Sequence, residues 1–243
     1  MALAITSKGT AFEGDGTTLL SSLTITAGAT VVVCTSHRTS ASISSVVYND
    51  GSDDYALTLR SSIDNANHAY VSIYSLDNAA GSAGSGSILG TLNISDALGF
   101  VVYQIAGAAA ANAFDKQAAA TGRSTTPNSG TSDVTFQDDE AVIGIFGSED
   151  SITVNSWDGT CTDNIQSRSD SSRHIQAATK IITSAAACNI AATISTKNYW
   201  AACVATFKAT GTAIKTVDGL AKASVKTVMG LAIANVKTID GLA

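Results

Sequence analysis

Short runs rich in Val, Ile, Thr, Tyr and Phe recur along the first 208 residues of this 243-residue chain, and Gly, Ser, Asn or Asp separates one run from the next. β-branched and aromatic residues favour strands, whereas the separating residues favour turns. Helix signals are weak over the same residues. Many short strands at such spacing are typical of β-sandwiches and jelly rolls. The clearest candidate strands are Leu23–Thr26, Thr30–Thr35, Ile43–Tyr48, Tyr55–Arg60, Ala69–Leu76, Ile88–Ile94, Phe100–Ile105, Val134–Phe136, Ala141–Phe146, Ile152–Ser156, Ile175–Thr183, Asn189–Ile194 and Trp200–Phe207.

The candidate strands form two similar series, which indicates an internal duplication with halves at about residues 18–107 and 131–208. The halves could form two small sandwiches or one sandwich with interleaved strands. We expect one, because neither half alone would bury a generous core. The segment from Ala106 to Ser132 is rich in small residues and is expected to cross between the halves. The matched segments are Ala29–Cys34 with Glu140–Ile145, Ser42–Val46 with Ser151–Val154, His68–Val71 with His174–Ala177, and Phe100–Tyr103 with Tyr199–Cys203.

The end of the chain repeats a unit every eleven residues, as Lys215–Ala221, Lys226–Ala232 and Lys237–Ala243. A unit this short cannot bury its own apolar face, so it must stack on copies of itself or on another chain. Residues 209–243 are therefore expected to serve attachment or oligomerisation. The expected contact residues are Ile214, Val217, Leu220, Val225, Val228, Leu231, Val236, Ile239 and Leu242.

The repeat is compatible with two conformations. An eleven-residue period would give a helix a right-handed supercoil. However, each unit contains a glycine and β-branched pairs, which disfavour an exposed helix. We favour strands at Ser224–Val228 and Asn235–Ile239, with turns at Asp218-Gly219, Met229-Gly230 and Asp240-Gly241. The repeated lysine would then form either a solvated row that blocks edge pairing or a docking stripe for an acidic partner.

Composition excludes several classes of partner. Charged residues are only 14% of the chain and the net charge is -6, so a nucleic acid is not an expected partner. The first residues lack the basic and apolar regions of a signal peptide, and no apolar run reaches the length of a membrane span. We therefore expect neither secretion through a signal peptide nor a membrane. The cysteines have no metal-binding spacing and are expected to be buried free thiols, with a disulfide after release from the cell as the alternative. They are Cys34, Cys161, Cys188 and Cys203.

Few residues suggest nucleophilic catalysis or stacking on a ligand. The nucleophile pattern Gly-x-Ser-x-Gly does not occur, and the three histidines, His37, His68 and His174, are expected at the surface or in turns. Of the two tryptophans, Trp200 lies in an apolar run and is expected in the core. Trp157 precedes an Asp-Gly turn, so it is the candidate ligand contact.

Carboxylates occur in three groups, Asp53-Asp54, Asp138-Asp139-Glu140 and Glu149-Asp150. Paired carboxylates are needed for glycoside hydrolysis, but each group lies between expected strands, where Asp favours turns. We expect turn residues here. Asn49–Asp54 loosely resembles a calcium loop but lacks the final bidentate glutamate. No phosphate-binding loop or dinucleotide fingerprint occurs.

The tail repeats resemble the Lys-[Ser/Thr]-[Ile/Val]-x-Gly-[Leu/Ile]-Ala repeats found at the ends of many tailed-bacteriophage virion proteins. The preceding residues are similar to β-sandwich domains of phage and bacterial surface proteins, through the Ser/Thr-rich link Thr121–Gly130 and the strand Tyr199–Ala202. The resemblance implies a virion structural protein, such as a head decoration protein, a head fibre or a tail-fibre component. It carries over no catalytic residue.

We therefore expect an all-β, jelly-roll-like β-sandwich over residues 1–208, built from two similar halves, followed by the repeat tail at 209–243. The expected function is a non-enzymatic virion component that self-assembles, as a homotrimer, and contacts other virion proteins of the capsid or fibre base. No cofactor or metal is expected, and the location is the virion after synthesis in the host cytoplasm. The alternatives are a carbohydrate-binding adhesin that contacts a host surface glycan through Trp157, and a glycan-degrading enzyme.

Overall fold

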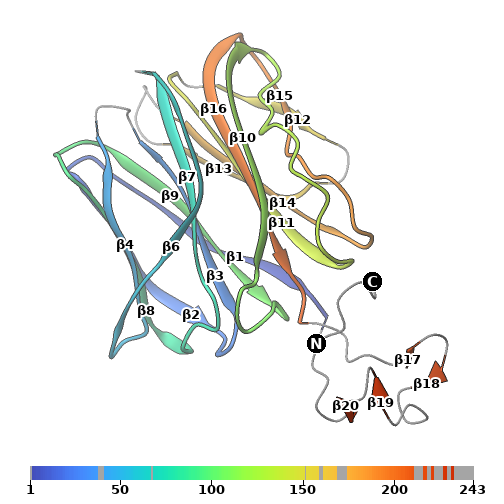
Figure 1. The fold of residues 1–243 in the computed structure, drawn as a ribbon. Helices are drawn as coiled ribbons and strands as arrows, with labels where there is room; N and C mark the ends of the chain where they lie inside the picture. Colours follow the sequence, from blue (N-terminus) through green and yellow to red (C-terminus); the bar gives the residue numbers. More distant parts are fainter. Residues whose placement is uncertain are drawn as a thin grey trace. The chain divides into compact units, whose positions relative to one another are not determined.

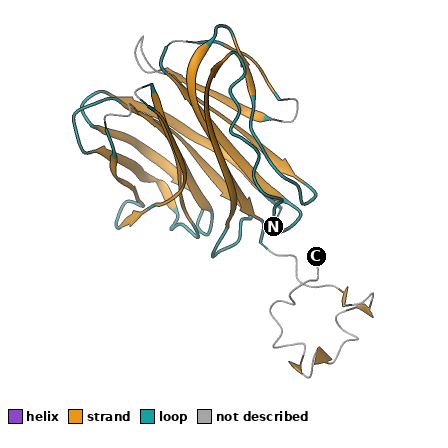
Figure 2. Ribbon diagram, turned by 45° about the horizontal axis from the view of Figure 1, so that its top comes forward, coloured by secondary structure: helices purple, strands orange, loops and turns teal. Residues whose placement is uncertain are grey.

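The computed structural model of the chain describes residues 2–37, 41–66, 68–150, 152–158, 161–168, 174–210, 216–217, 220–221, 227–228 and 231–232. The chain divides into two compact units, Met1–Ala209 and Thr210–Ala243, named here the body and the tail. The described residues form strands, turns and loops without a helix (Figure 2). The expected all-β fold is confirmed. No helix within the described ranges is long and apolar enough to cross a bilayer.

The strands of the body fall into two consecutive groups, which we call the first and second halves. The first half contains β1 (Ala4–Glu13), β2 (Thr17–Ile25), β3 (Thr30–His37), β4 (Ile43–Asn49), β5 (Asp54–Ala56), β6 (Thr58–Asn65), β7 (Ala69–Leu76), β8 (Ser82–Leu92) and β9 (Leu98–Ala106). The second half contains β10 (Phe114–Ser124), β11 (Glu140–Ser148), β12 (Val154–Trp157), β13 (Thr162–Arg168), β14 (His174–Ile182), β15 (Ala192–Ile194) and β16 (Asn198–Lys208).

Each half forms its own sandwich, and the two sandwiches stack to give four layers (Figure 1). The first outer sheet has the order β2-β8-β4-β5, and the first inner sheet has the order β1-β9-β3-β7-β6. The second inner sheet follows as β10-β16-β11-β14-β13, and β12-β15 forms the second outer sheet. The expected interleaving of strands from the two halves is therefore wrong. Each half has apolar clusters of its own, and contact between the two inner sheets adds a larger one.

The two inner sheets have the same topology. Matching β1, β9, β3, β7 and β6 with β10, β16, β11, β14 and β13 reproduces the strand order. The register of the strand pairs also agrees. Thr30 pairs with Ile105 in the first inner sheet, and the corresponding residue Ala141 pairs with Phe207 in the second. An internal duplication would produce this correspondence, and it aligns Ala29–Cys34 with Glu140–Ile145 as the sequence predicts.

Three details of the predicted duplication need correction. The segment between Ala106 and Ser132 is not a plain crossover, because it contains β10. Each half also begins earlier than expected, with β1 and β10 ahead of residues 18 and 131. The match of His68 with His174 is out of register by two residues. Tyr70 pairs with His37, and His174 pairs with Ser148, so Tyr70 is the counterpart of His174.

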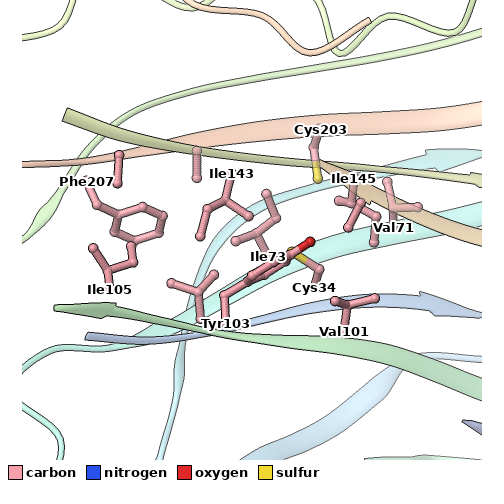
Figure 3. Packing of buried hydrophobic residues seen from close by; sticks show 14 of the residues in the cluster. Cys34, Val71, Ile73, Val101, Tyr103, Ile105, Ile143, Ile145, Cys203 and Phe207 are labelled. Carbon is pink, nitrogen blue, oxygen red and sulfur yellow. The ribbon is translucent and has the colours of Figure 1, made fainter. Parts of the chain in front are cut away.

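The largest apolar cluster lies between the inner sheets, which are covered on both faces. Every residue of β3, β9 and β11 except Ala106 is buried. A continuous apolar run such as Val31–Cys34 suits a strand that is covered on both sides. Full burial of one aliphatic side chain contributes about 1.5–3 kcal/mol, so this contact is a major source of stability. Figure 3 shows its central members, which include Cys34, Val71, Ile73, Val101, Tyr103, Ile105, Ile143, Ile145, Cys203 and Phe207.

The described part of the tail consists of two short β pairs. β17 (Thr216–Val217) pairs with β18 (Leu220–Ala221), and β19 (Thr227–Val228) pairs with β20 (Leu231–Ala232). Thr227–Val228 falls within the expected strand Ser224–Val228, whereas β17, β18 and β20 lie outside the two strands that the sequence predicts. The expected turn positions and the strand at residues 235–239 lie outside the described residues.

Candidate functional site

The tail pairs use the same register in two successive repeats. Val217 pairs with Leu220, and eleven residues later Val228 pairs with Leu231. These four belong to the nine expected contact residues. The other five lie outside the described residues: Ile214, Val225, Val236, Ile239 and Leu242. A pair of two-residue strands is too small to be stable alone, so each hairpin needs neighbours to persist.

Trp157 ends β12 and is half-buried. Its ring lies 5.6 Å from that of Phe146, between centroids, and packs against two apolar clusters beneath the second outer sheet. The indole Nε1 is buried and forms no hydrogen bond within the described residues. The ring therefore packs inside the second half, and its predicted contact with a ligand stays a prediction.

Trp200 lies in the core, as expected. Its side chain is buried in β16, and its Nε1 donates a hydrogen bond to Ser124 Oγ at 3.0 Å. The thiols of Cys34, Cys188 and Cys203 are buried and that of Cys161 is half-buried, and all four are free. Burial raises the pKa of Cys203 to about 12, so this thiol stays protonated at neutral pH.

Two of the three histidines differ from the expected surface or turn positions, whereas His68 lies in a turn as expected. His37 and His174 are buried, and the His37 ring stacks on Tyr70 at 4.5 Å between centroids. His68 alone is half-exposed, and its Nδ1 lies 2.7 Å from Glu149 Oε2. His37 ends β3 and His174 begins β14. Both strands belong to inner sheets, which are covered on both faces, so these side chains are buried.

Carboxylates in the loop between β4 and β5 serve the turn, as expected. Asp50 Oδ1 accepts hydrogen bonds from the backbone N–H groups of Ser52 at 2.8 Å and Asp53 at 2.9 Å. These bonds hold the pKa of Asp50 below its usual value. Asp54 Oδ1 accepts a hydrogen bond from Asn49 Nδ2 at 2.7 Å. Within the described residues, no group of three or more His, Cys, Asp or Glu side chains could hold a metal ion.

Glu140 departs from the expected turn role, because it is fully buried at the start of β11. Burial, followed by the nearby negative charge of Asp115, raises its pKa from 4.5 to about 7. The sequence places Glu140 directly after two exposed aspartates, which conceals its burial. The sequence match of Glu140 with Ala29 indicates this burial, because Ala29 is buried in the first half.

A polar seam joins the halves where β6 meets β10, at one edge of each inner sheet. Ser61 Oγ donates a hydrogen bond to Gln117 Oε1 at 2.9 Å. Asn65 Nδ2 donates to two carbonyl oxygens of the second half, those of Gly122 at 3.2 Å and Trp200 at 2.8 Å. No local sequence pattern predicts these hydrogen bonds between the halves, because the packing of whole sheets decides which edge strands meet.

One end of the seam carries a stack of three side chains. The ring of His68 stacks on Tyr199 with 3.7 Å between centroids and 2° between planes. The guanidinium of Arg123 lies 4.8 Å from the same Tyr199 ring. Together with the contact between His68 and Glu149, the stack links the β6–β7 turn to the second half.

The seam also contains a shallow groove of about 290 Å³, lined by Leu59, Arg60, Ser61, Ser62 and Gln117. Arg60 is held in place because its Nε donates to Ser75 Oγ at 2.8 Å. The lining offers hydroxyl, amide and guanidinium groups beside an exposed leucine, but no carboxylate. Such a lining can form hydrogen bonds with a hydroxylated ligand and lacks the acid groups that glycoside hydrolysis requires.

Comparison with known proteins identifies no relative. The chain matches no protein family, no curated protein and no solved structure.

Proposed function

We propose that this chain is a non-enzymatic structural protein of a tailed-phage virion, which assembles or attaches through its tail. The repeated β pairing carries this proposal, because Val217–Leu220 and Val228–Leu231 recur with one register and one spacing. Hairpins of this size bury little surface by themselves. Repeated units of this kind gain stability by stacking on neighbours, and those neighbours can be other copies of the tail or another virion protein.

Native mass measurement of the full chain tests the tail. We expect the full chain to form a homotrimer and a version ending at Ala209 to be a monomer. A matched variant replaces Leu220, Leu231 and Leu242 with serine and is expected to behave like the truncated chain. A control variant that replaces the three repeat lysines with glutamine should still assemble. Monomers of the full chain at concentrations up to about 100 µM, where contacts of typical strength assemble, would contradict the oligomerisation role.

Attachment without self-association gives a different result. A fusion of residues 210–243 to an unrelated monomeric protein should then bind phage particles that lack this chain. Binding of the fusion, with loss of binding in the triple serine variant, supports an attachment segment. Absence of both assembly and particle binding would refute a role of the tail in building the virion.

A carbohydrate-binding adhesin is the second candidate, and the groove at the seam favours it. Its serine hydroxyls, glutamine amide and arginine can bind the hydroxyl groups of a sugar, and such convergent polar groups characterise small ligand sites. Glycan arrays probed with the full chain test this candidate. Gln117→Ala should weaken binding at the groove, and Trp157→Ala should weaken it if the indole contributes. No binding to any glycan would remove the candidate.

A further inference from the structure

Glu140 lies at a corner where three strands of the second inner sheet meet. β11 begins at this residue, β10 begins nearby at Phe114, and β16 ends at Lys208. Glu140 is fully buried, and neither carboxylate oxygen forms a hydrogen bond within the described structure. A buried ionised carboxylate without partners is costly, so such groups usually keep their proton.

Asp115 supplies a second carboxylate at the same corner. Its side chain is only 8% exposed, and its Oδ2 accepts a hydrogen bond from the backbone N–H of Phe136 at 2.6 Å. Lys116 Nζ lies 4.0 Å from Asp115 Oδ1, so Asp115 has both a hydrogen-bond donor and a nearby cation.

Several other titratable groups lie on the elements around Glu140, but Asp115 is the charged neighbour that raises its pKa. The Thr206 hydroxyl and the backbone of Gln137 act in the opposite direction, and burial outweighs them. Burial and a second carboxylate nearby both make ionisation of Glu140 costly, so Glu140 holds a proton. The surrounding groups are Asp115 and Lys116 of β10, Asp138 and Asp139 of the preceding loop, Lys180 of β14, Cys188 of the following segment, and Lys208 of β16.

The same corner holds the last residues of the body. Ala209 N–H donates to the carbonyl of Asp139 at 3.2 Å, and Gln137 Nε2 donates to the carbonyl of Ala209 at 3.2 Å. Lys208 N–H donates to the carbonyl of Ala113 at 2.7 Å. Residues within three positions before Glu140 and Asp115 thus bond to the backbone from which the tail departs.

We propose that Glu140 holds a proton in this buried corner, and that the protonated side chain is a pH-sensitive clamp on residues Lys208 and Ala209. The proton keeps the corner closed. Its release to solvent leaves a negative charge on the buried Glu140 carboxylate, which favours local opening and frees the root of the tail.

The direction of the pH effect follows from the two states of Glu140. In the opened corner Glu140 has its ordinary pKa near 4.5, whereas burial raises the pKa to about 7 in the closed corner. Opening therefore releases a proton between these values. Stabilisation of the closed corner is complete below pH 4.5, declines as the pH rises, and is lost once the pH has passed about 7.

Hydrogen exchange measured by mass spectrometry on the full chain tests the clamp. Peptides covering residues 203–210 are followed from pH 5 to pH 8.5, with correction for the intrinsic exchange rate. We expect the opening constant to rise up to about tenfold per pH unit as far as pH 7 and then to level off. Peptides from β3 in the first half serve as an internal reference and should show no such rise.

Variants separate the clamp from a general effect of pH. Glu140→Gln should keep the corner protected and make its opening independent of pH. Asp115→Asn should make the rise in opening level off at a lower pH, because one source of the raised pKa in the closed corner is removed. Asp133→Asn changes an exposed carboxylate on the same connecting segment and should behave like the unmodified chain.

Two results would overturn the clamp. One is opening of residues 203–210 that does not change with pH in the unmodified chain. The other is an unchanged pH dependence in Glu140→Gln or, if that variant fails to fold, in Asp115→Asn. Neither result bears on the assembly role of the tail, which is tested separately by mass.

Discussion

The contact between the two inner sheets can be tested at Gly147 of β11. A methyl group added here would lie 2.5 Å from Ser36 Oγ and 2.9 Å from Val71 Cγ1, both in the facing sheet. Real carbon contacts are longer, so something must shift. Ser36 can rotate away, but Val71 is β-branched and fully buried, which leaves it little freedom.

We therefore expect Gly147→Ala to lower the free energy of unfolding by about 2 kcal/mol, within the range of about 1–3 kcal/mol for overpacked cores. Urea unfolding of the full chain, followed by tryptophan fluorescence, gives the measurement. Gly14→Ala is the matched control, because an added methyl group there has nothing within 4 Å. The control should change the free energy of unfolding by less than about 0.5 kcal/mol.

A double-mutant cycle identifies the cause of the loss. Ser36→Ala removes the Oγ and leaves the Ser36 Cβ at 3.4 Å from the added methyl group, while Val71→Ala removes the closer carbon. Combined with Gly147→Ala, each should recover about 0.5–2 kcal/mol relative to additivity. Equal effects of Gly147→Ala and Gly14→Ala, or strict additivity with both partners, would refute the face-to-face packing.

Three further outcomes follow from the same structure. Asn65→Ala should destabilise the chain by about 1–2 kcal/mol, because two carbonyl groups of the second half lose a donor; urea unfolding with Asn65→Asp as comparison measures it. The thiols of Cys34 and Cys203 should resist a thiol reagent at pH 8 until the chain is unfolded, since burial raises the pKa of both. Trp157→Ala should cost about 2 kcal/mol and Trp157→Phe clearly less, as measured by thermal unfolding at fixed concentration.

Much of the fold could be predicted because strand signals here are strong and local. Runs such as Val31–Cys34 are apolar and rich in β-branched residues. The match of Ala29–Cys34 with Glu140–Ile145 predicts the register of the second half. β10 was missed because its sequence is rich in alanine, with Ala118–Ala120 at its centre. Alanine has low strand propensity, and pairing with β16 determines the conformation instead.

The chemistry of the body was less predictable than its strands. Glu140 follows Asp138 and Asp139, and such an acidic run is typical of an exposed turn. The burial of Glu140 depends on β10, β11 and β16, three strands that come from separate segments of the chain. Ser61 and Gln117 likewise meet only because the two inner sheets pack face to face, a contact between residues that are 56 positions apart in the sequence. Local patterns do not contain that information.

The order of the two halves along the chain has a consequence for synthesis. All strands of the first half lie before residue 107, so both of its sheets can form on the ribosome before β10 has been made. Until the second inner sheet arrives, one face of the first remains apolar and open to solvent. At about 5–20 residues per second, that interval is on the order of ten seconds. The nascent first half is therefore the stage at which this chain is most exposed to aggregation and to capture by chaperones.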